Sequence, residues 1–340
     1  MATEIENVPA VPALTRKDFV TPNDVRWCPG CGDYAILNSL QRTLPELGVP
    51  RENFVIVSGI GCSSRFPYYM QTYGFHTIHG RAPTVATGVK VANPDLSVWI
   101  VTGDGDGLSI GGNHLLHVLR RNLNVTILLF NNRIYGLTKG QYSPTSPVGT
   151  RTKTTPGGSV DHPINPLLFA LGAEATFIAR TVDNNPKHMV ETFKAAHEHQ
   201  GVSFVEIFQN CVIFNDSTWD PVYAKENRDD QMLFLEAGKP LLFGKNKEKG
   251  IRLNGLMPEV CDASAPDVLT HHPDHPSPLY SQMLACMGLP DFPTPIGVIR
   301  KIERPTYESL IHNQVEDAKA KKGTGTWQEL LHGSSTWTVE

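Results

Sequence analysis

The sequence predicts an α/β fold in which a parallel sheet is covered by helices on both faces, followed by a C-terminal extension. Continuous apolar segments recur at residues 54–58, 97–102 and 125–130, and stretches with helical periodicity separate them. Strands that are apolar throughout, rather than at alternate residues, are typical of parallel sheets buried between helices. With 340 residues, 40% of them hydrophobic, the chain is large enough to bury such a core.

The individual elements follow in the order that this fold requires. A helix is predicted from Asp33 to about Leu44, because Ile36 and Leu40 repeat on one face and Pro45 follows. The alternation of strands and helices then continues to about residue 208, as in a doubly wound sheet. The remaining predictions are strands at 54–58, 97–102, 125–130 and 202–208 and helices at 81–91, 109–121 and 184–199.

Three regions are predicted along the chain. Residues 1–32 form a Pro-rich arm with a Cys-x-x-Cys loop, residues 33–220 form the α/β domain, and residues 221–340 form the extension. Within the domain, residues 138–166 are rich in Gly, Pro and Thr, and a loop of that length is usually functional or disordered. The extension lacks clear periodicity, so we expect it to have little core of its own and to pack on a partner subunit.

Composition excludes several classes of protein. Thirty basic and 34 acidic residues give a net charge of −4, too balanced to predict a nucleic-acid surface. No apolar stretch approaches the length of a membrane span. The N-terminal residues do not resemble a signal peptide, and six cysteines are too few for a secreted disulfide scaffold. We therefore expect a cytoplasmic protein whose thiols bind metal or do redox work.

One pair of motifs predicts a magnesium–diphosphate site. Asp104 lies in a Gly-Asp-Gly turn after a predicted strand, and Asn132 follows the next strand, 28 positions later (132 − 104). Magnesium prefers hard oxygen ligands, which Asp104, Asn132 and the carbonyl of Ile134 would supply. The helix expected near Ser109 would direct N–H groups toward anionic oxygens. The alternative is an ordinary turn with a chance Asn-Asn pair, which the spacing disfavours.

Four cysteines form the second constellation: Cys28 and Cys31 in one loop, then Cys62 and Cys211, each after a predicted strand. Cys-x-x-Cys alone fits a redox pair, half of a zinc site or half of a cluster site. No strand precedes the loop and no second close pair follows, so a [4Fe–4S] cluster is favoured. Cys211 is the preferred fourth ligand because carboxyl ends of parallel strands share one edge, where Asp104 also belongs.

These segments together resemble the β subunit of the 2-oxoacid:ferredoxin oxidoreductases, a thiamine-diphosphate and iron–sulfur family. The resemblance covers about residues 20–220 and implies the thiamine-diphosphate-binding fold. It also implies a separate α subunit that supplies the activating glutamate and much of the substrate pocket, an assembly of two αβ pairs, and ferredoxin as electron partner. The matching segments are Trp27-Cys28-Pro29-Gly30-Cys31-Gly32, Gly61-Cys62-Ser63, Gly103-Asp104-Gly105-Asp106, Asn131-Asn132-Arg133-Ile134-Tyr135-Gly136 and Thr138-Lys139-Gly140-Gln141-Tyr142-Ser143-Pro144-Thr145.

The resemblance assigns roles to individual residues. Magnesium would be bound by Asp104, Asn132 and Ile134, and the [4Fe–4S] cluster by Cys28, Cys31, Cys62 and Cys211. The expected contacts of thiamine diphosphate are Gly61, Cys62, Ser63, Ser64, His79, Gly103, Asp104, Gly105, Asp106, Asn132, Ile134, Gly136, Leu137 and Thr138.

The segment from Leu137 to Lys139 resembles members of the family that use 2-oxoglutarate. Pyruvate-specific relatives tend to carry Asn where Leu137 stands, and Lys139 or Arg65 would suit a second carboxylate; Thr138 lies between them. A lysine or an arginine at positions 139 and 65 would be equally typical of an exposed, solvated side chain with no role in binding. The implied reaction is oxidative decarboxylation of 2-oxoglutarate with CoA to succinyl-CoA and CO2, or the reverse carboxylation, the direction of CO2 fixation in a reductive TCA cycle.

Three alternatives remain open at this stage. A pyruvate or branched-chain 2-oxoacid enzyme of the same family differs only in substrate. A non-oxidative thiamine-dependent decarboxylase or carboligase would not require four cysteines. A zinc-binding interaction protein would contain zinc and no iron.

Overall fold

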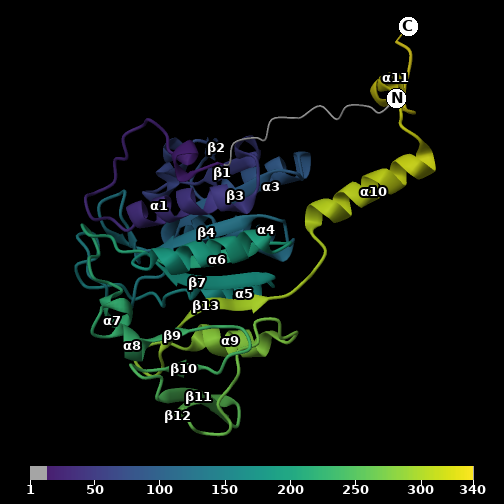
Figure 1. Cartoon of the computed structure of the whole chain (residues 1–340). Helices are drawn as coiled ribbons and strands as arrows, with labels where there is room; N and C mark the ends of the chain where they lie inside the picture. Colours follow the sequence, from purple (N-terminus) through teal and green to yellow (C-terminus); the bar gives the residue numbers. More distant parts are fainter. Residues whose placement is uncertain (1–13, 340) are drawn as a thin grey trace, which may run out of the picture.

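The computed structural model of the protein describes residues 14–339. An eight-stranded sheet forms the centre of the molecule. The strands lie in the order β2-β1-β3-β4-β8-β7-β13-β9, and every neighbouring pair is parallel except β13 and β7 (Figure 1). The strands are β1 (Phe54–Ser58), β2 (Tyr73–His76), β3 (Ser97–Gly103), β4 (Thr126–Asn131), β7 (Phe177–Val182), β8 (Ser203–Phe208), β9 (Met232–Phe234) and β13 (Thr294–Lys301).

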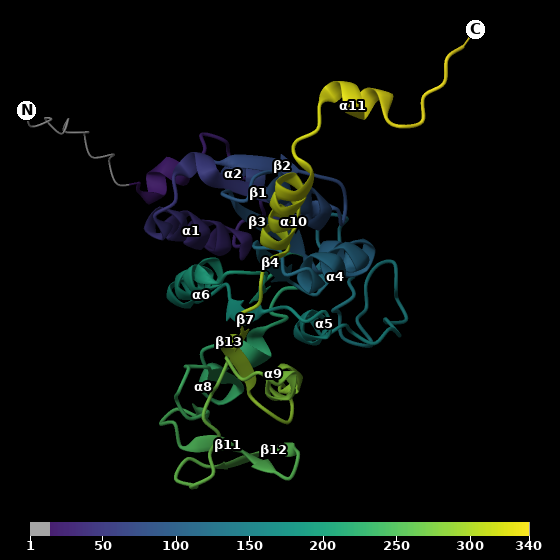
Figure 2. The ribbon, with the colours of Figure 1, turned by 90° about the vertical axis from the view of Figure 1, so that its right-hand side faces the viewer.

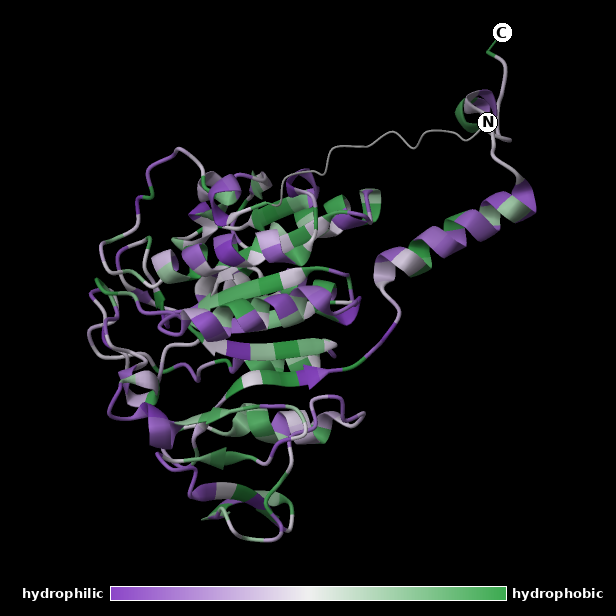
Figure 3. Ribbon diagram, in the orientation of Figure 1, coloured by the Kyte–Doolittle hydropathy of each residue, from purple (hydrophilic) through white to green (hydrophobic). Residues whose placement is uncertain are grey.

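Helices cover both faces of this sheet (Figure 2), as the apolar strands predicted. Alternate residues of β1 point to opposite sides: Val55 and Val57 belong to one buried cluster, Phe54 and Ile56 to the other. The hydropathy colouring shows the central strands as mainly apolar (Figure 3). One face carries α1 (Asp33–Thr43), α2 (Phe66–Tyr69) and α6 (Pro186–Glu198), and the other carries α3 (Ala82–Ala92), α4 (Gly112–Arg120), α5 (Pro166–Gly172) and α9 (Pro278–Cys286).

The predicted strands and helices up to residue 131 agree with the structure within a few residues, with one exception at the start of α4. The predicted helix at 109–121 is divided: a π-helical turn, Asp106–Ile110, directly follows the Gly-Asp-Gly segment, and α4 begins only at Gly112. Four strands of the sheet, β2, β7, β9 and β13, were not predicted. β7 contains Arg180, whose charge interrupts the apolar pattern that predicts a buried strand. The strand is nevertheless buried, and it pairs with β8.

The expectation of little core beyond residue 220 is wrong for its first part. Strands β9 and β13 lie in the main sheet, and Leu233, Leu284 and Ile299 join its larger core cluster. Pro295 and Gly297 weaken the strand signal of β13, but pairing with β7 stabilises it. The region also contains α7 (Asp220–Tyr223), α8 (Arg228–Gln231) and an antiparallel sheet of β10 (Leu242–Phe243), β11 (Lys249–Asn254) and β12 (Met257–Asp262).

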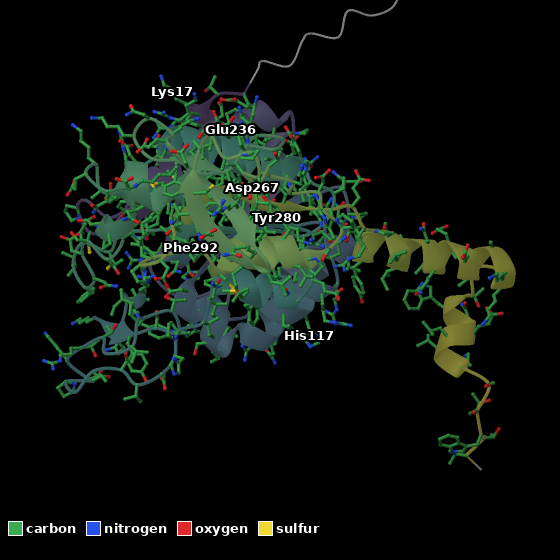
Figure 4. All side chains as sticks on the ribbon, turned by 90° about the horizontal axis from the view of Figure 1, so that it is seen from below. Lys17, His117, Glu236, Asp267, Tyr280 and Phe292 are labelled. Atoms are coloured by element: carbon green, nitrogen blue, oxygen red, sulfur yellow. The ribbon has the colours of Figure 1, made fainter. Side chains whose placement is uncertain are left out.

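The last two helices extend away from the body of the molecule, to which the start of the first is anchored. Figure 4 shows α10 (Tyr307–Lys322) and α11 (Trp327–His332) extending away from the sheet, with side chains around them. Glu308, at the start of α10, is the buried anchor of this segment and accepts a hydrogen bond from the backbone of Asn124. Among residues 14–339, no helix combines the length and apolar character needed to cross a membrane.

Candidate active site

Two adjoining cavities lie at the carboxyl ends of β1, β3, β4 and β8. The first, which we call the thiol cavity, measures about 270 Å³ and is lined by Cys28, Cys31, Cys62 and Cys211. The second, the carboxylate cavity, measures about 100 Å³ and contains Asp104. Parallel strands bring these distant segments to one edge of the sheet. The cavities share a wall made of Asp33, Cys62, Asn132, Gly136 and Leu137.

Asp104 is buried at the base of the carboxylate cavity, with 1% of its surface exposed. Its Oδ2 atom accepts hydrogen bonds from the hydroxyls of Ser143 and Thr145, the latter at 2.6 Å. Burial raises the pKa of Asp104, because its neighbours are neutral donors that only partly replace water. A bound cation would therefore stabilise the charged form of this carboxylate, whose side-chain hydrogen-bond donors are two neutral hydroxyls. Both hydroxyls come from the long loop at 138–166.

Asn132 is fixed in orientation from two sides. Its Oδ1 accepts a hydrogen bond from the backbone of Ile134 at 3.1 Å, and its Nδ2 donates to Gln209 at 2.7 Å. Arg133, between them, adopts φ = 57° and places its guanidinium 3.8 Å from the ring centre of Trp219. Because the amide is fixed, the Asn132 oxygen and the carbonyl end of Ile134 belong to one rigid turn.

Asp106 lines the carboxylate cavity, and its oxygens also accept several hydrogen bonds from the protein. Its carboxylate, predicted to contact the cofactor, is occupied by donors of the protein: the ring of His79, the hydroxyl of Thr102, and the backbones of Ile60 and Gly80. These bonds join the turns that follow β1 and β2 to the Gly-Asp-Gly turn. Asp106 therefore positions His79 at the rim of the carboxylate cavity rather than offering free oxygens to it.

Two glycines permit close approaches at the site. A Cβ at Gly105 would lie 2.2 Å from the ring of Tyr135, whose hydroxyl donates to the Gly105 carbonyl at 3.1 Å. A Cβ at Gly136 would lie 3.5 Å from Sγ of Cys62 and 3.6 Å from Sγ of Cys211. The absence of a side chain at Gly136 therefore keeps the wall between the two cavities thin.

The thiol loops are joined by hydrogen bonds between distant segments. The indole of Trp27 donates to the carbonyl of Cys62 at 2.7 Å, and Gln209 donates to Sγ of Cys31 at 3.3 Å. Burial, followed by the Asp33 charge, raises the pKa of Cys62 to about 12 and also raises that of Cys31. Within residues 14–339, no three or more His, Cys, Asp or Glu side chains are grouped as a metal site. The thiols line a common cavity without forming a closed ligand set.

Asp33, in the shared wall, is the most unusual buried group. It is 1% exposed, and neither carboxylate oxygen has a hydrogen-bond partner among the described residues. Burial, reinforced by the charge of Asp183, raises the pKa of Asp33 to about 7. A buried acceptor without a donor indicates that the cavities are shaped to hold further groups.

The residues expected to contact substrate line the two cavities. Arg65 and Lys139 line the thiol cavity, Thr138 lines the carboxylate cavity, and Leu137, 45% exposed, lines both. The Arg65 guanidinium donates to the carbonyl of Arg26 at 3.0 Å, and Lys139 has φ = 75°. Two cationic residues therefore contribute to the lining of the thiol cavity.

The other predicted cofactor contacts divide into two groups. The residues that line the carboxylate cavity are Gly61, Cys62, Ser63, His79, Gly103, Asp104, Gly105, Asp106, Asn132, Ile134, Gly136, Leu137 and Thr138. Ser64 lines neither cavity; it is fully buried, and its carbonyl accepts a hydrogen bond from Ser58 at 2.7 Å. The tight 3-10 turn Ser63–Arg65 directs consecutive side chains apart, which is why Ser63 and Ser64 differ.

Sequence reasoning did not connect Asp33 or Gln209 with the site. Trp27, Ser143 and Thr145 lie in segments that carry the family resemblance, but no role was predicted for them, including the hydrogen bonds of the two hydroxyls to Asp104. Asp33 was assigned only as the start of a helix. No local pattern marks Gln209, because its partners are 77 and 178 positions away in the chain.

Comparisons with known proteins agree with this arrangement. A family model described as "Thiamine pyrophosphate enzyme, C-terminal TPP binding domain" matches residues 59–207, which include Asp104 and Asn132. Over residues 59–207, the fold and this match thus define a thiamine pyrophosphate enzyme domain.

Individual relatives show to which family of thiamine pyrophosphate enzymes the chain is similar. The 2-oxoglutarate oxidoreductase subunit KorB of Mycobacterium tuberculosis is 53% identical over 330 residues, covering 95% of this chain and 88% of the relative. A 2-oxoacid:ferredoxin oxidoreductase subunit beta of Sulfolobus sp. is 38% identical, covering 74% and 90%. This chain belongs to the β subunits of the 2-oxoacid:ferredoxin oxidoreductases.

A solved structure shows the same fold over nearly the whole chain. It is the 2-oxoglutarate:ferredoxin oxidoreductase from Magnetococcus marinus with 2-oxoglutarate, coenzyme A and succinyl-CoA bound. The TM-score is 0.75 at 35% sequence identity, with 95% of this chain and 96% of that chain covered.

Proposed function

We propose that this chain is the β subunit of an enzyme that decarboxylates 2-oxoglutarate oxidatively with CoA, yielding succinyl-CoA and CO2, or runs the reverse carboxylation. The observation that carries the proposal is the wall shared by the two cavities, formed in part by Cys62, Asn132 and Gly136. Through this wall, the carboxylate cavity, which is the proposed diphosphate site, adjoins the cavity lined by the four cysteines. Relatives named for 2-oxoglutarate support the substrate.

Thiamine diphosphate and Mg2+ are the proposed occupants of the carboxylate cavity. The buried carboxylate of Asp104 and the fixed amide oxygen of Asn132 fit a hard cation, with the Ile134 carbonyl as third ligand. Thiamine diphosphate held there would supply an acceptor for the electron pair released on loss of CO2. The protein supplies orientation: Ser143 and Thr145 hold Asp104, and Asp106 holds His79 at the rim.

A [4Fe–4S] cluster is the proposed occupant of the thiol cavity, with Cys28, Cys31, Cys62 and Cys211 as ligands. Thiolates are the ligands that such clusters use, and all four cysteines line one cavity. Because burial raises the pKa of Cys62 to about 12, cluster assembly must displace protons from these thiols. When bound, the cluster would supply one-electron transfer toward ferredoxin.

Specificity for 2-oxoglutarate is proposed to depend on Leu137, Thr138, Lys139 and Arg65. The cationic residues Arg65 and Lys139 line the thiol cavity and would attract the second carboxylate of the substrate. The chain acts with an α subunit, in an assembly of two αβ pairs that also binds CoA. A reducing cytoplasm is the proposed location, since the free thiols must remain available to iron.

The test is anaerobic purification with the α subunit, followed by quantification of iron, sulfide and thiamine diphosphate. We expect a brown protein with absorbance near ~400 nm that dithionite bleaches. Asp104→Ala should lose magnesium-dependent retention of thiamine diphosphate while keeping iron. Thiamine diphosphate retained by that variant, or a wild type without iron, would refute the assignment.

A substrate panel distinguishes the remaining members of the family. The assembled enzyme should reduce ferredoxin with 2-oxoglutarate and CoA faster than with pyruvate or branched-chain 2-oxoacids. Turnover of 2-oxoglutarate without ferredoxin or CoA would instead indicate a non-oxidative decarboxylase.

A further inference from the structure

One side chain bonds to both proposed cofactor sites at once. Gln209 directly follows β8 and is 1% exposed. Its Oε1 accepts from Nδ2 of Asn132 at 2.7 Å, and its Nε2 donates to Sγ of Cys31 at 3.3 Å. The amide thus spans the wall between the carboxylate and thiol cavities, both of which Asn132 lines.

The orientation of this amide is determined by its neighbours. The backbone of Ile134 donates to Oδ1 of Asn132, so Asn132 must present its N–H2 group to Gln209. Gln209 therefore turns its oxygen to Asn132 and its nitrogen to the other side. There, Nε2 has two acceptors for its two hydrogens: Sγ of Cys31 and the carbonyl of Asn210, at 2.5 Å. The backbone is also fixed, because the Gln209 N–H donates to the Asn131 carbonyl at 3.0 Å.

We propose that Gln209 is a positioning residue that serves both cofactor sites: its oxygen holds Asn132 in the orientation that presents Oδ1 to magnesium, and its N–H donates to the Cys31 thiolate that binds the cluster. This inference rests on the proposed function and adds to it a residue that affects cofactor affinity and cluster potential together.

The consequence for the cluster follows from charge. Reduction adds negative charge to the cluster and its thiolates, and an N–H donor stabilises that charge. Gln209 therefore makes the cluster a better electron acceptor than the thiolates alone would. Removing the donor lowers the midpoint potential. A tenfold change in the equilibrium constant for reduction corresponds to ~59 mV for one electron.

The consequence for magnesium follows from geometry. Without Gln209, the Nδ2 group of Asn132 loses its acceptor, and the amide is free to rotate or to bind water. Outer-shell partners of metal ligands typically change affinity by about 10–100-fold when they are removed. A cation on Oδ1 of Asn132 would also polarise the amide and strengthen its bond to Gln209, because hydrogen bonds in a chain reinforce each other.

Two substitutions separate these effects in the assembled αβ enzyme. Gln209→Met retains the shape and removes both bonds, whereas Gln209→Glu retains an acceptor for Asn132 and loses the donor to Cys31. Gln200→Met is the matched control, because Gln200 is an exposed glutamine at the opposite end of β8. The measurements are the cluster midpoint potential, by EPR-monitored titration, and the Mg2+ concentration that half-saturates thiamine diphosphate binding.

We expect Gln209→Met to lower the midpoint potential and to raise the half-saturating Mg2+ concentration about tenfold. Gln209→Glu should lower only the potential, and the control should change neither. If Gln209→Met fails to hold iron, the Mg2+ titration is run on cluster-free samples of all four proteins. A normal potential in iron-loaded Gln209→Met, or normal Mg2+ binding in its cluster-free form, overturns the proposal. A wild type without iron or thiamine diphosphate would instead count against the proposed function.

Discussion

The indole N–H of Trp27 donates a 2.7 Å hydrogen bond to the carbonyl of Cys62, 35 positions along the chain. It joins the Cys-x-x-Cys loop to the turn after β1, so two of the three thiol-bearing segments are connected by one side chain. We expect Trp27→Phe to cost about 1–2 kcal/mol and to reduce bound iron per chain. Thermal unfolding and iron analysis check this. Trp99→Phe, which loses a buried bond to Ser97, should lower stability without affecting iron.

Thr145 connects Asp104 to Asn131 through its hydroxyl, at 2.6 and 3.0 Å. Thr145→Val retains the shape and removes both contacts, so the Asp104 carboxylate loses one of its two hydroxyl donors. We expect the Mg2+ affinity of thiamine diphosphate binding to fall about 10-fold or more, as for other partners of metal ligands. Thr154→Val, an exposed position in the same loop, serves as the control. Equal Mg2+ affinity in both variants would show that Thr145 is only a packing residue.

Gly136 separates the two cavities without a side chain. A methyl group there would make only ordinary contacts with Sγ of Cys62 and of Cys211, so Gly136→Ala should fold with a stability within about 1 kcal/mol of wild type. It would nonetheless occupy space beside both sulfurs, and we expect less iron per chain and slower reduction of the cluster by substrate. Gly157→Ala, where a Cβ meets nothing, should match wild type in both.

Arg180 and Glu206 form a buried ion pair across β7 and β8, with Nε to Oε2 at 2.7 Å, and Glu206 also accepts from Asn131. Arg180→Met leaves a buried carboxylate without its cation and should cost about 3–5 kcal/mol. The double variant Arg180→Met/Glu206→Gln removes the charge and keeps an acceptor for Asn131, so we expect it to be more stable than the single variant. Urea unfolding of the three proteins provides the comparison.

His199 gives the fold a predictable pH dependence. Burial, then the Lys301 charge, lowers the pKa of His199 to about 4, and its Nε2 lies 2.8 Å from the Thr176 hydroxyl. The unfolded chain binds a proton near pH 6.5 and the folded chain does not, so stability falls as pH decreases from about 6.5 toward 4. The slope contributed by one such group is at most ~1.4 kcal/mol per pH unit. The difference between the urea midpoints at about pH 5 and about pH 7 should be smaller in His199→Gln than in wild type.

The strands that position the site were predictable because each is composed mainly of apolar residues, which indicates a buried strand. Segments 54–58, 97–102 and 125–130 are apolar throughout, and each ends in the turn that carries Cys62, Asp104 or Asn132. β7 and β13 were not predictable, because Arg180, Pro295 and Gly297 are acceptable only in the presence of particular neighbours. Their stability comes from pairing, which no local window contains.

The sequence alone determined the chemistry available at the site: four thiols, one carboxylate in a Gly-Asp-Gly turn, and an amide after the following strand. Residue type and strand order suffice for this, because parallel strands deliver their carboxyl ends to one edge. Only the tertiary structure decided which side chains orient them: Thr145 on Asp104, Trp27 on Cys62 and Gln209 on Asn132. Hydrogen bonds between residues far apart in the chain depend on distances of a few ångströms, and only the packed fold sets those distances.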